Sequence, residues 1–284
     1  MKRIITILFV AASAAASAQT KTLTQAIITT KTTIVSPDED DAGAPNASVS
    51  GNGNEEVRVM RFGGDGETKT TTWLKNDMVK TFSESDMGRT TAIRDNTKKM
   101  TTTIMEMMGR KFGFYATDED QEQMRKRMDS MMQSRRSDNN FAVATSAPQT
   151  NIEYVNETKK ISGYDCKKAL VINTRSNGKK DTTLVWYIPD MKLQNVASTG
   201  GSFGGFGGMS PQLGSGGMDM LTGFPMQYER TMNRGRKMTV QVTKLVIDKD
   251  VDAKEFDIPK DVDIKPAKDM QMPGGGQGFQ TRLN

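Results

Sequence analysis

Methionine sulfur is the most distinctive potential metal ligand in this chain, which contains 21 methionines and no histidine. Thioether sulfur binds soft ions such as Cu(I). Closely spaced methionines form three clusters: Met105, Met107 and Met108; Met218 and Met220; and Met270 and Met272. Because these clusters are scattered along the chain, binding of Cu(I) or Ag(I) is an alternative hypothesis rather than the leading one.

Side chains suited to catalysis are scarce. The absence of histidine removes the commonest general base, the Ser-His and Cys-His nucleophile pairs, and the commonest zinc ligand. Cys166 is the single cysteine, so the chain has no internal disulfide, and its place in an alternating pattern predicts a buried structural thiol. The acidic run 38–41 lacks the alternate ligand spacing of a calcium loop. We therefore expect a non-enzymatic protein that needs no cofactor.

These residues must be positioned by a mainly β fold. Short alternating segments recur at intervals of about 8–12 residues, bounded by Gly, Asn and Asp, which is typical of antiparallel hairpins. Asn177-Gly178 is the strongest of these turn signals. The predicted strands cover residues 23–35, 57–62, 70–75, 78–83, 89–94, 99–105, 152–158, 164–174, 182–188, 226–231 and 237–247.

One helix is predicted, over residues 118–136. Acidic residues open this segment and basic residues close it, which suits the helix dipole, and Asp118 with Gln121 approximates a capping box. Its methionines follow helical spacing and form one stripe: Met124, Met128, Met131 and Met132. This stripe could close over an apolar face of the sheet as a ligand lid, or it could be ordinary core.

The start of the chain indicates export. Lys2 and Arg3 precede an apolar run over 4–12, and Ala16-Ser17-Ala18 supplies the small residues of a cleavage site. We predict a signal peptide over 1–18, no lipid anchor, no membrane span, and a periplasmic or secreted protein.

The mature chain is predicted to be a single β-rich domain over residues 19–265. Polar and glycine-rich composition predicts flexible loops at 36–54 and 198–217 and a disordered tail at 266–284. The formal net charge of the whole chain is only +5, and its basic residues alternate with acidic ones, so nucleic-acid binding has no support.

Three stretches carry a resemblance to known families: Lys160–Ala169, Val185–Asp190 and Leu221–Glu229. In this order they resemble exported proteins of the domain of unknown function 4412 family and, more distantly, the GLPGLI family. The specific match covers residues 152–259. The strand rhythm and the closing 256–259 segment are also similar to the lipoprotein-carrier superfamily. That resemblance implies a mainly β (α+β) fold, a curled antiparallel sheet forming an open half-barrel with one covering helix. It implies no reaction.

The leading hypothesis is therefore a periplasmic binding protein for a lipid or another hydrophobic ligand. The candidate ligand-binding residues are Met124, Met128, Met131, Met132, Tyr164 and Trp186. Besides metal binding, the other alternative is a structural or assembly role in the cell envelope, because exposed sheet edges can pair with a partner strand.

Overall fold

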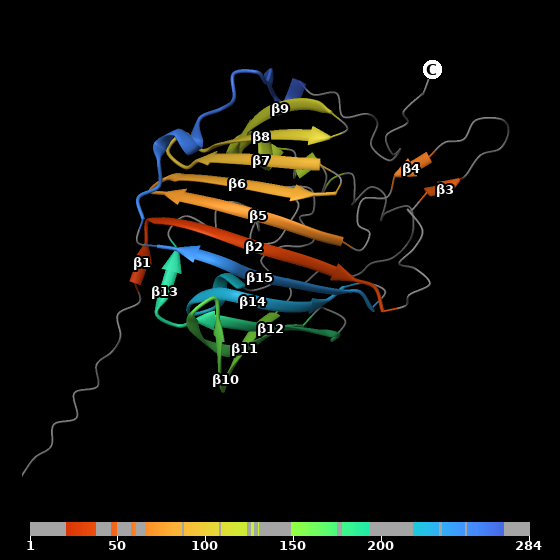
Figure 1. Ribbon diagram of the computed structural model, residues 1–284. Helices are drawn as coiled ribbons and strands as arrows, with labels where there is room; N and C mark the ends of the chain where they lie inside the picture. Colours follow the sequence, from red (N-terminus) through yellow and green to blue (C-terminus); the bar gives the residue numbers. More distant parts are fainter. Residues whose placement is uncertain are drawn as a thin grey trace, which may run out of the picture.

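One large, mainly antiparallel sheet dominates the computed structural model of the chain (Figure 1). The structure describes residues 21–37, 47–49, 58–60, 66–86, 88–107, 109–123, 126–127, 130, 149–174, 178–193, 218–232, 235–247 and 249–269. The predicted signal peptide 1–18 and loop 198–217 lie outside these residues, as does most of loop 36–54.

The strands are numbered in chain order. They are β1 (Lys21–Leu23), β2 (Gln25–Val35), β3 (Ala47–Val49), β4 (Arg58–Met60), β5 (Gly66–Lys75), β6 (Met78–Ser85), β7 (Gly88–Asp95), β8 (Met100–Met107), β9 (Arg110–Thr117), β10 (Gln149–Ile161), β11 (Tyr164–Thr174), β12 (Lys180–Ile188), β13 (Met191–Leu193), β14 (Phe224–Thr231), β15 (Lys237–Val246) and β16 (Ile264–Pro266). Three short 3₁₀ helices are η4 (Met218–Met220), η6 (Ala253–Phe256) and η7 (Ala267–Asp269).

Twelve strands form the main sheet in the order β10-β11-β12-β14-β15-β2-β5-β6-β7-β8-β9-β16. The sheet is open, with β10 and β16 at its edges. Two-stranded pairs β1-β13 and β3-β4 accompany it. The prediction of a mainly β, antiparallel fold is confirmed.

Several sequence-based details were wrong. Strand β9 was not predicted, although Phe112, Phe114 and Ala116 alternate along it. Residues 47–49 form β3 within the segment predicted to be a loop. The tail does not begin at residue 266, because Pro266 ends β16 and η7 follows. β16 pairs with β9 in parallel, and β1 pairs with β13 in parallel, two pairings that the prediction of antiparallel hairpins did not include.

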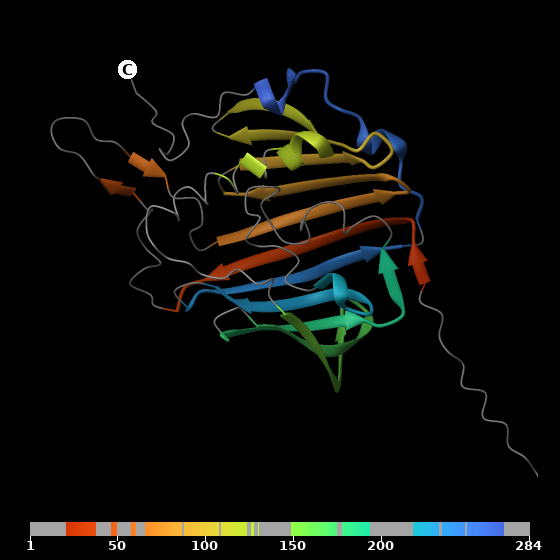
Figure 2. The same cartoon turned by 180° about the vertical axis from the view of Figure 1, so that it is seen from behind.

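The helical region begins where predicted but is capped differently. Residues 118–123, 126–127 and 130 are helical (Figure 2). Thr117 is the N-cap: its hydroxyl accepts from the Asp120 N–H at 3.1 Å, and the Asp120 carboxylate accepts from the Thr117 N–H at 3.0 Å. The predicted Asp118–Gln121 box was therefore one residue out of register. Asp118 instead pairs with Arg94, which is buried in β7.

The buried core lies mostly where β2, β5, β6, β14 and β15 meet β1, β11 and β13. The main cluster comprises Leu23, Ala26, Ile28, Leu74, Val79, Ile161, Cys166, Met191, Phe224, Met226, Val242 and Leu245. A second cluster on β11 and β12 includes Ala169, Val171, Val185 and Tyr187. Within the part of the chain that the structure describes, no helix has the length and apolar character needed to cross a bilayer.

Residues 249–269, called the C-terminal segment below, return across the sheet after β15. Figure 1 draws this segment in blue, passing the ends of β2 and β5 to β8 before reaching β9. Val251 and Phe256 of this segment form a third buried cluster with Ile93 of β7. The segment therefore covers one face of the sheet at the ends of these strands.

Candidate functional site

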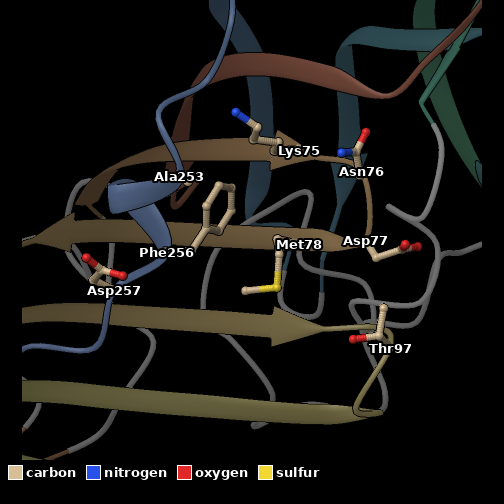
Figure 3. Close-up of a pocket in the computed structure, with 8 residues that line it drawn as sticks. All are labelled: Lys75, Asn76, Asp77, Met78, Thr97, Ala253, Phe256 and Asp257. Atoms are coloured by element: carbon tan, nitrogen blue, oxygen red, sulfur yellow. The ribbon is translucent and has the colours of Figure 1, made fainter.

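A pocket of about 420 Å³ lies where the C-terminal segment meets two strand turns (Figure 3). The β5–β6 turn, the β7–β8 turn and η6 each supply part of its wall. The residues that line it are Lys75, Asn76, Asp77, Met78, Thr97, Ala253, Phe256 and Asp257. Figure 3 shows Phe256 and Met78 near one another, with Asp77 and Asp257 on opposite sides of them.

The β5–β6 turn is tight because Asn76 adopts a left-handed conformation, with φ of 50°. Asparagine tolerates this region better than most residues do. The Asn76 N–H donates to the Thr24 carbonyl at 2.7 Å, and the Asn96 N–H of the next turn donates to the Asp77 carbonyl at 2.9 Å. The second bond holds the two turns side by side, and the first ties the β5–β6 turn to the chain just before β2, so both fix that side of the pocket.

The floor of the pocket is apolar. Phe256 is 8% exposed and packs with Ile93 and Val251, while Trp73 and Met78 are partly buried against the same cluster. Along β5 and β6 the register places Trp73 opposite Lys80, two residues from Met78. A ligand in this pocket would meet thioether and aromatic surface below and polar groups at the rim.

Lys75 links the sheet to the C-terminal wall. Its Nζ donates to the Val251 carbonyl at 2.5 Å and lies 3.2 Å from an Asp250 carboxylate oxygen. The Val251 N–H in turn donates to the side chain of Gln25 at 3.3 Å. Because Lys75 pairs with Asp250, the carboxylate of Asp250 offsets the positive charge of Lys75 beside the pocket.

Lys80 performs a similar role beneath Phe256. Its Nζ lies 5.0 Å from the centroid of the Trp73 ring, within the range of a cation–π contact. The same Nζ is 3.5 Å from a carboxylate oxygen of Glu255 on η6. Trp73 is thus close enough to the pocket to report on its occupancy.

Asp95 rigidifies the β7–β8 turn that carries Thr97. Its carboxylate accepts from the Thr97 hydroxyl at 2.5 Å and from the N–H groups of Thr97 and Lys98, both at 3.0 Å. The hydrogen bond from Thr97 is the main cause that lowers the pKa of Asp95 from 3.8 to about 2, although burial opposes the shift. The rim at Thr97 is therefore built on an ionised, hydrogen-bonded carboxylate.

Of the predicted ligand residues, the two that the structure describes, Tyr164 and Trp186, do not line this pocket. Met124, Met128, Met131 and Met132 lie outside the described residues. Tyr164 and Trp186 are partly buried against the main core cluster. Trp186 also has the Nζ atoms of Lys159 and Lys168 at 5.6 and 6.0 Å from its ring centroid.

The methionines proposed for Cu(I) are divided between distant elements. Met105 and Met107 lie two residues apart on β8 and so point to the same face. Met218 and Met220 form η4, just before β14, and Met108 lies outside the described residues. Since β14 and β8 are six strands apart in the sheet, the two clusters do not share one ion.

The cysteine prediction is confirmed. Cys166 is 0% exposed in β11, and burial raises the pKa of its thiol to about 11. A thiol that is neutral and shielded at physiological pH is a poor nucleophile.

Sequence reasoning located the two turns but missed the third wall of the pocket. The predicted strands 70–75, 78–83, 89–94 and 99–105 leave turns at 76–77 and 95–98, whereas Phe256 was noted only as part of the closing 256–259 segment. The apolar positions Val251, Phe256 and Val262 in an otherwise charged segment were the available signal that this segment packs on the sheet.

A smaller pocket of about 300 Å³ lies at the opposite ends of β6 to β9. Its lining is polar: Glu84, Ser85, Asp86, Gly88, Arg89, Glu106 and Gly109. Arg89 and Glu84 are already paired across it at 2.9 Å. It offers no apolar surface comparable to Met78 and Phe256.

Comparison with known proteins gives one family match. The family model described as Domain of unknown function (DUF4412) matches residues 60–262. None of the curated proteins compared with the chain matches it. Two solved structures of PNGF-II, in the C2 and P21 space groups, are similar over 86% of this chain, at 14% and 17% identity and a TM-score of 0.35 in both cases. The chain spans only 31% and 32% of those chains, and this degree of similarity carries no functional argument.

Proposed function

The chain belongs to the family of the domain of unknown function DUF4412, and we propose that it is an exported, non-enzymatic protein that binds a lipid or another hydrophobic ligand. The ligand would place an apolar group against Met78 and Phe256 in the pocket beneath the C-terminal segment. The observation that carries this proposal is that apolar floor, bordered by two hydrogen-bonded turns and by η6.

The dimensions of the pocket support binding of one small group. Ligand sites commonly measure about 300–1,000 Å³ and combine apolar walls with a few polar groups. This pocket has a volume of about 420 Å³, and its rim carries Lys75, Asp77, Thr97 and Asp257. Methionine adapts its shape to varied apolar partners, which suits Met78 for such a wall.

Two features of the chain support binding rather than catalysis. The sequence contains no histidine, and its single thiol, at Cys166, is buried with a raised pKa. The carboxylate of Asp95 beside the pocket has a lowered pKa, so it would be a weak general base near neutral pH.

The resemblance of the sequence to lipoprotein carriers extends this proposal to the wider architecture. We infer that the open sheet curls toward a half-barrel in solution and that the methionine stripe at 124–132 adds a second apolar wall. Export through the segment 1–18 would deliver the protein to the periplasm or beyond, where such ligands are exchanged between membranes.

A direct test uses the two tryptophans of the chain. In a Trp186→Phe background the intrinsic fluorescence reports on Trp73 alone, which lies against Phe256. Titration with the neutral probe N-phenylnaphthylamine should give saturable binding at one site, with energy transfer from Trp73.

A charged variant and a matched control give this test its specificity. Met78→Asp should weaken probe binding at least about tenfold, because a carboxylate in an apolar wall is poorly solvated. Met107→Asp places the same charge at a partly buried methionine outside the pocket and should leave binding unchanged. Equal binding by both variants would show that the probe does not occupy this pocket.

Two alternatives keep specific support. Met105 and Met107 share one face of β8 and could contribute two sulfur ligands to Cu(I), and anaerobic Cu(I) titration of Met105→Leu would test this role. An envelope-assembly role has support in β10, a 13-residue edge strand, although its register shift between Val155 and Thr158 makes the edge a less regular template.

A further inference from the structure

The C-terminal segment is fastened to the sheet by a consistent pattern of charges. Among the described residues, three ion pairs join the segment to the sheet, and in each the lysine belongs to a sheet strand and the acid to the segment. These pairs are Lys75–Asp250 at 3.2 Å, Lys80–Glu255 at 3.5 Å and Lys111–Asp261 at 2.9 Å. Hydrogen bonding between Lys111 and Asp261 is the main cause that raises the pKa of the lysine and lowers that of the aspartate. These ion pairs therefore attach the segment to the sheet at strands from β5 to β9.

Burial within the segment is confined to a few points. Val251, Phe256 and Val262 are 1%, 8% and 9% exposed, and they are separated by charged residues that are mostly exposed. Backbone pairing with the sheet amounts to the three residues of β16. Few buried contacts and little backbone pairing are the features of a segment that opens at low free-energy cost.

Gly113 on β9 contacts residues near the C-terminal end of the segment. Gly113 is buried, and a Cβ atom at this position would lie 2.2 Å from Ile264 Cδ1 and 3.1 Å from Val262 Cγ1. No larger residue fits there while Ile264 keeps its place. Gly113 therefore forms the seat on which the last part of the segment rests, three strands beyond β6 and the pocket.

We propose that the C-terminal segment is a detachable clasp that forms one wall of the pocket, so that its release from the sheet removes that wall and frees a bound ligand. The ligand part of this proposal rests on the proposed function above; the release itself does not. Opening the clasp removes Ala253, Phe256 and Asp257 from the pocket wall and uncovers Trp73 and Met78.

The charges make the clasp sensitive to its surroundings. The side chains of Asp250, Glu255 and Asp261 are 75%, 41% and 62% exposed, so salt screens these pairs. Rising ionic strength should increase the open population, and an anionic membrane surface would compete with the three acids for the sheet lysines. The clasp thus provides a way to couple ligand exchange to the charge of the environment.

The test weakens the contact between Gly113 and the end of the C-terminal segment, at a position that does not line the pocket. Gly113→Val, in the Trp186→Phe background, forces Ile264 out of contact with β9, whereas Gly66→Val is a matched control because a Cβ at Gly66 meets nothing within 4 Å. Opening is measured by native trypsin cleavage after Lys254 and Lys260, and by acrylamide quenching of Trp73. Gly113→Val should raise cleavage after both lysines about tenfold and increase quenching, while Gly66→Val behaves as the parent.

A charge exchange keeps the test decisive if Gly113→Val fails to fold. Lys111→Glu should open the clasp, and addition of Asp261→Lys should restore protection by re-forming the pair in reverse. Cleavage confined to Lys260, with unchanged Trp73 quenching, would show that only the end of the segment opens and would overturn the clasp. Absence of rescue by the reversed pair would do so as well.

The same variants separate the two proposals. If the parent does not bind N-phenylnaphthylamine but quenching and cleavage respond as expected, the proposed function is wrong and the clasp stands. If the parent binds the probe and Gly113→Val neither exposes Trp73 nor changes the rate of binding, the pocket stands and the clasp is wrong.

Discussion

Asp95 should contribute about 2 kcal/mol to stability at neutral pH. Its carboxylate, only 13% exposed, caps the β7–β8 turn by accepting from Thr97 and Lys98, and the hydrogen bond from Thr97 is the leading cause of its pKa of about 2 against an ordinary value of 3.8. Each unit of pKa difference between the folded and unfolded states corresponds to about 1.36 kcal/mol. Because the folded pKa is depressed, the contribution is fully present above pH 4 and is lost as pH falls through about 2.

The perturbation is Asp95→Ala, which removes the charge and all of these hydrogen bonds. Urea unfolding should show a loss of about 2 kcal/mol at pH 7 relative to the parent. At pH 2.5 about two thirds of this pH-dependent contribution should already be gone from the parent, so the difference between the two proteins should narrow. Asp95→Asn should cost less, because an amide oxygen can still accept from the turn.

Asp165→Ala is the matched control, since the Asp165 side chain is 85% exposed and its carboxylate lies 3.7 Å from the Nζ of Lys160. This exposed pair should contribute little. A penalty for Asp95→Ala that is the same at pH 7 and pH 2.5, or no larger than that of Asp165→Ala, would refute the electrostatic account of the turn.

Three further predictions concern the scaffold. Cys166 should react slowly with a bulky thiol reagent in the native protein and rapidly in urea, and Cys166→Ala should cost about 1–2 kcal/mol in urea unfolding because it leaves a small cavity. Gly223→Ala should cost about 1–3 kcal/mol, measured as a lower thermal midpoint, because Gly223 has φ of 147° and its Cβ would lie 2.3 Å from the Ile188 carbonyl oxygen. Arg94→Lys should lower stability by about 1–2 kcal/mol, because lysine cannot make the bidentate contact with the Asp118 carboxylate. Equal urea midpoints for Arg94→Lys and the parent would show that the second hydrogen bond adds no stability.

The hairpins were largely predictable from the sequence because their signals are local. Alternation and turn residues located β5 to β8, and β11 was predicted with the bounds that the structure shows. The same local logic identified Cys166 as a buried thiol. Register within these hairpins follows from short turns, since a two-residue connection leaves few alternative pairings.

The capping error shows where local reasoning ends. Thr117, rather than Asp118, caps the helix because the Asp118 carboxylate is drawn to Arg94, 24 residues earlier in the chain. Nothing in residues 117–121 alone decides between a box of Thr117 with Asp120 and a box of Asp118 with Gln121. The choice depended on a buried guanidinium that needs an anionic partner in the folded state.

The sequence by itself determined the β class, the hairpin turns, the buried thiol and the scarcity of catalytic side chains, because each depends on residue type or on neighbours a few positions away. Which residues form the pocket, and where the C-terminal segment contacts the sheet, was decided only by the tertiary structure. Phe256 belongs to the buried cluster that packs against Trp73, and Ile264 lies against Gly113, and each pair is separated by more than 140 residues of sequence. The C-terminal segment that carries Phe256 and Ile264 consists mostly of charged residues. Such contacts depend on where the sheet places its partners in space, and no local periodicity encodes that position.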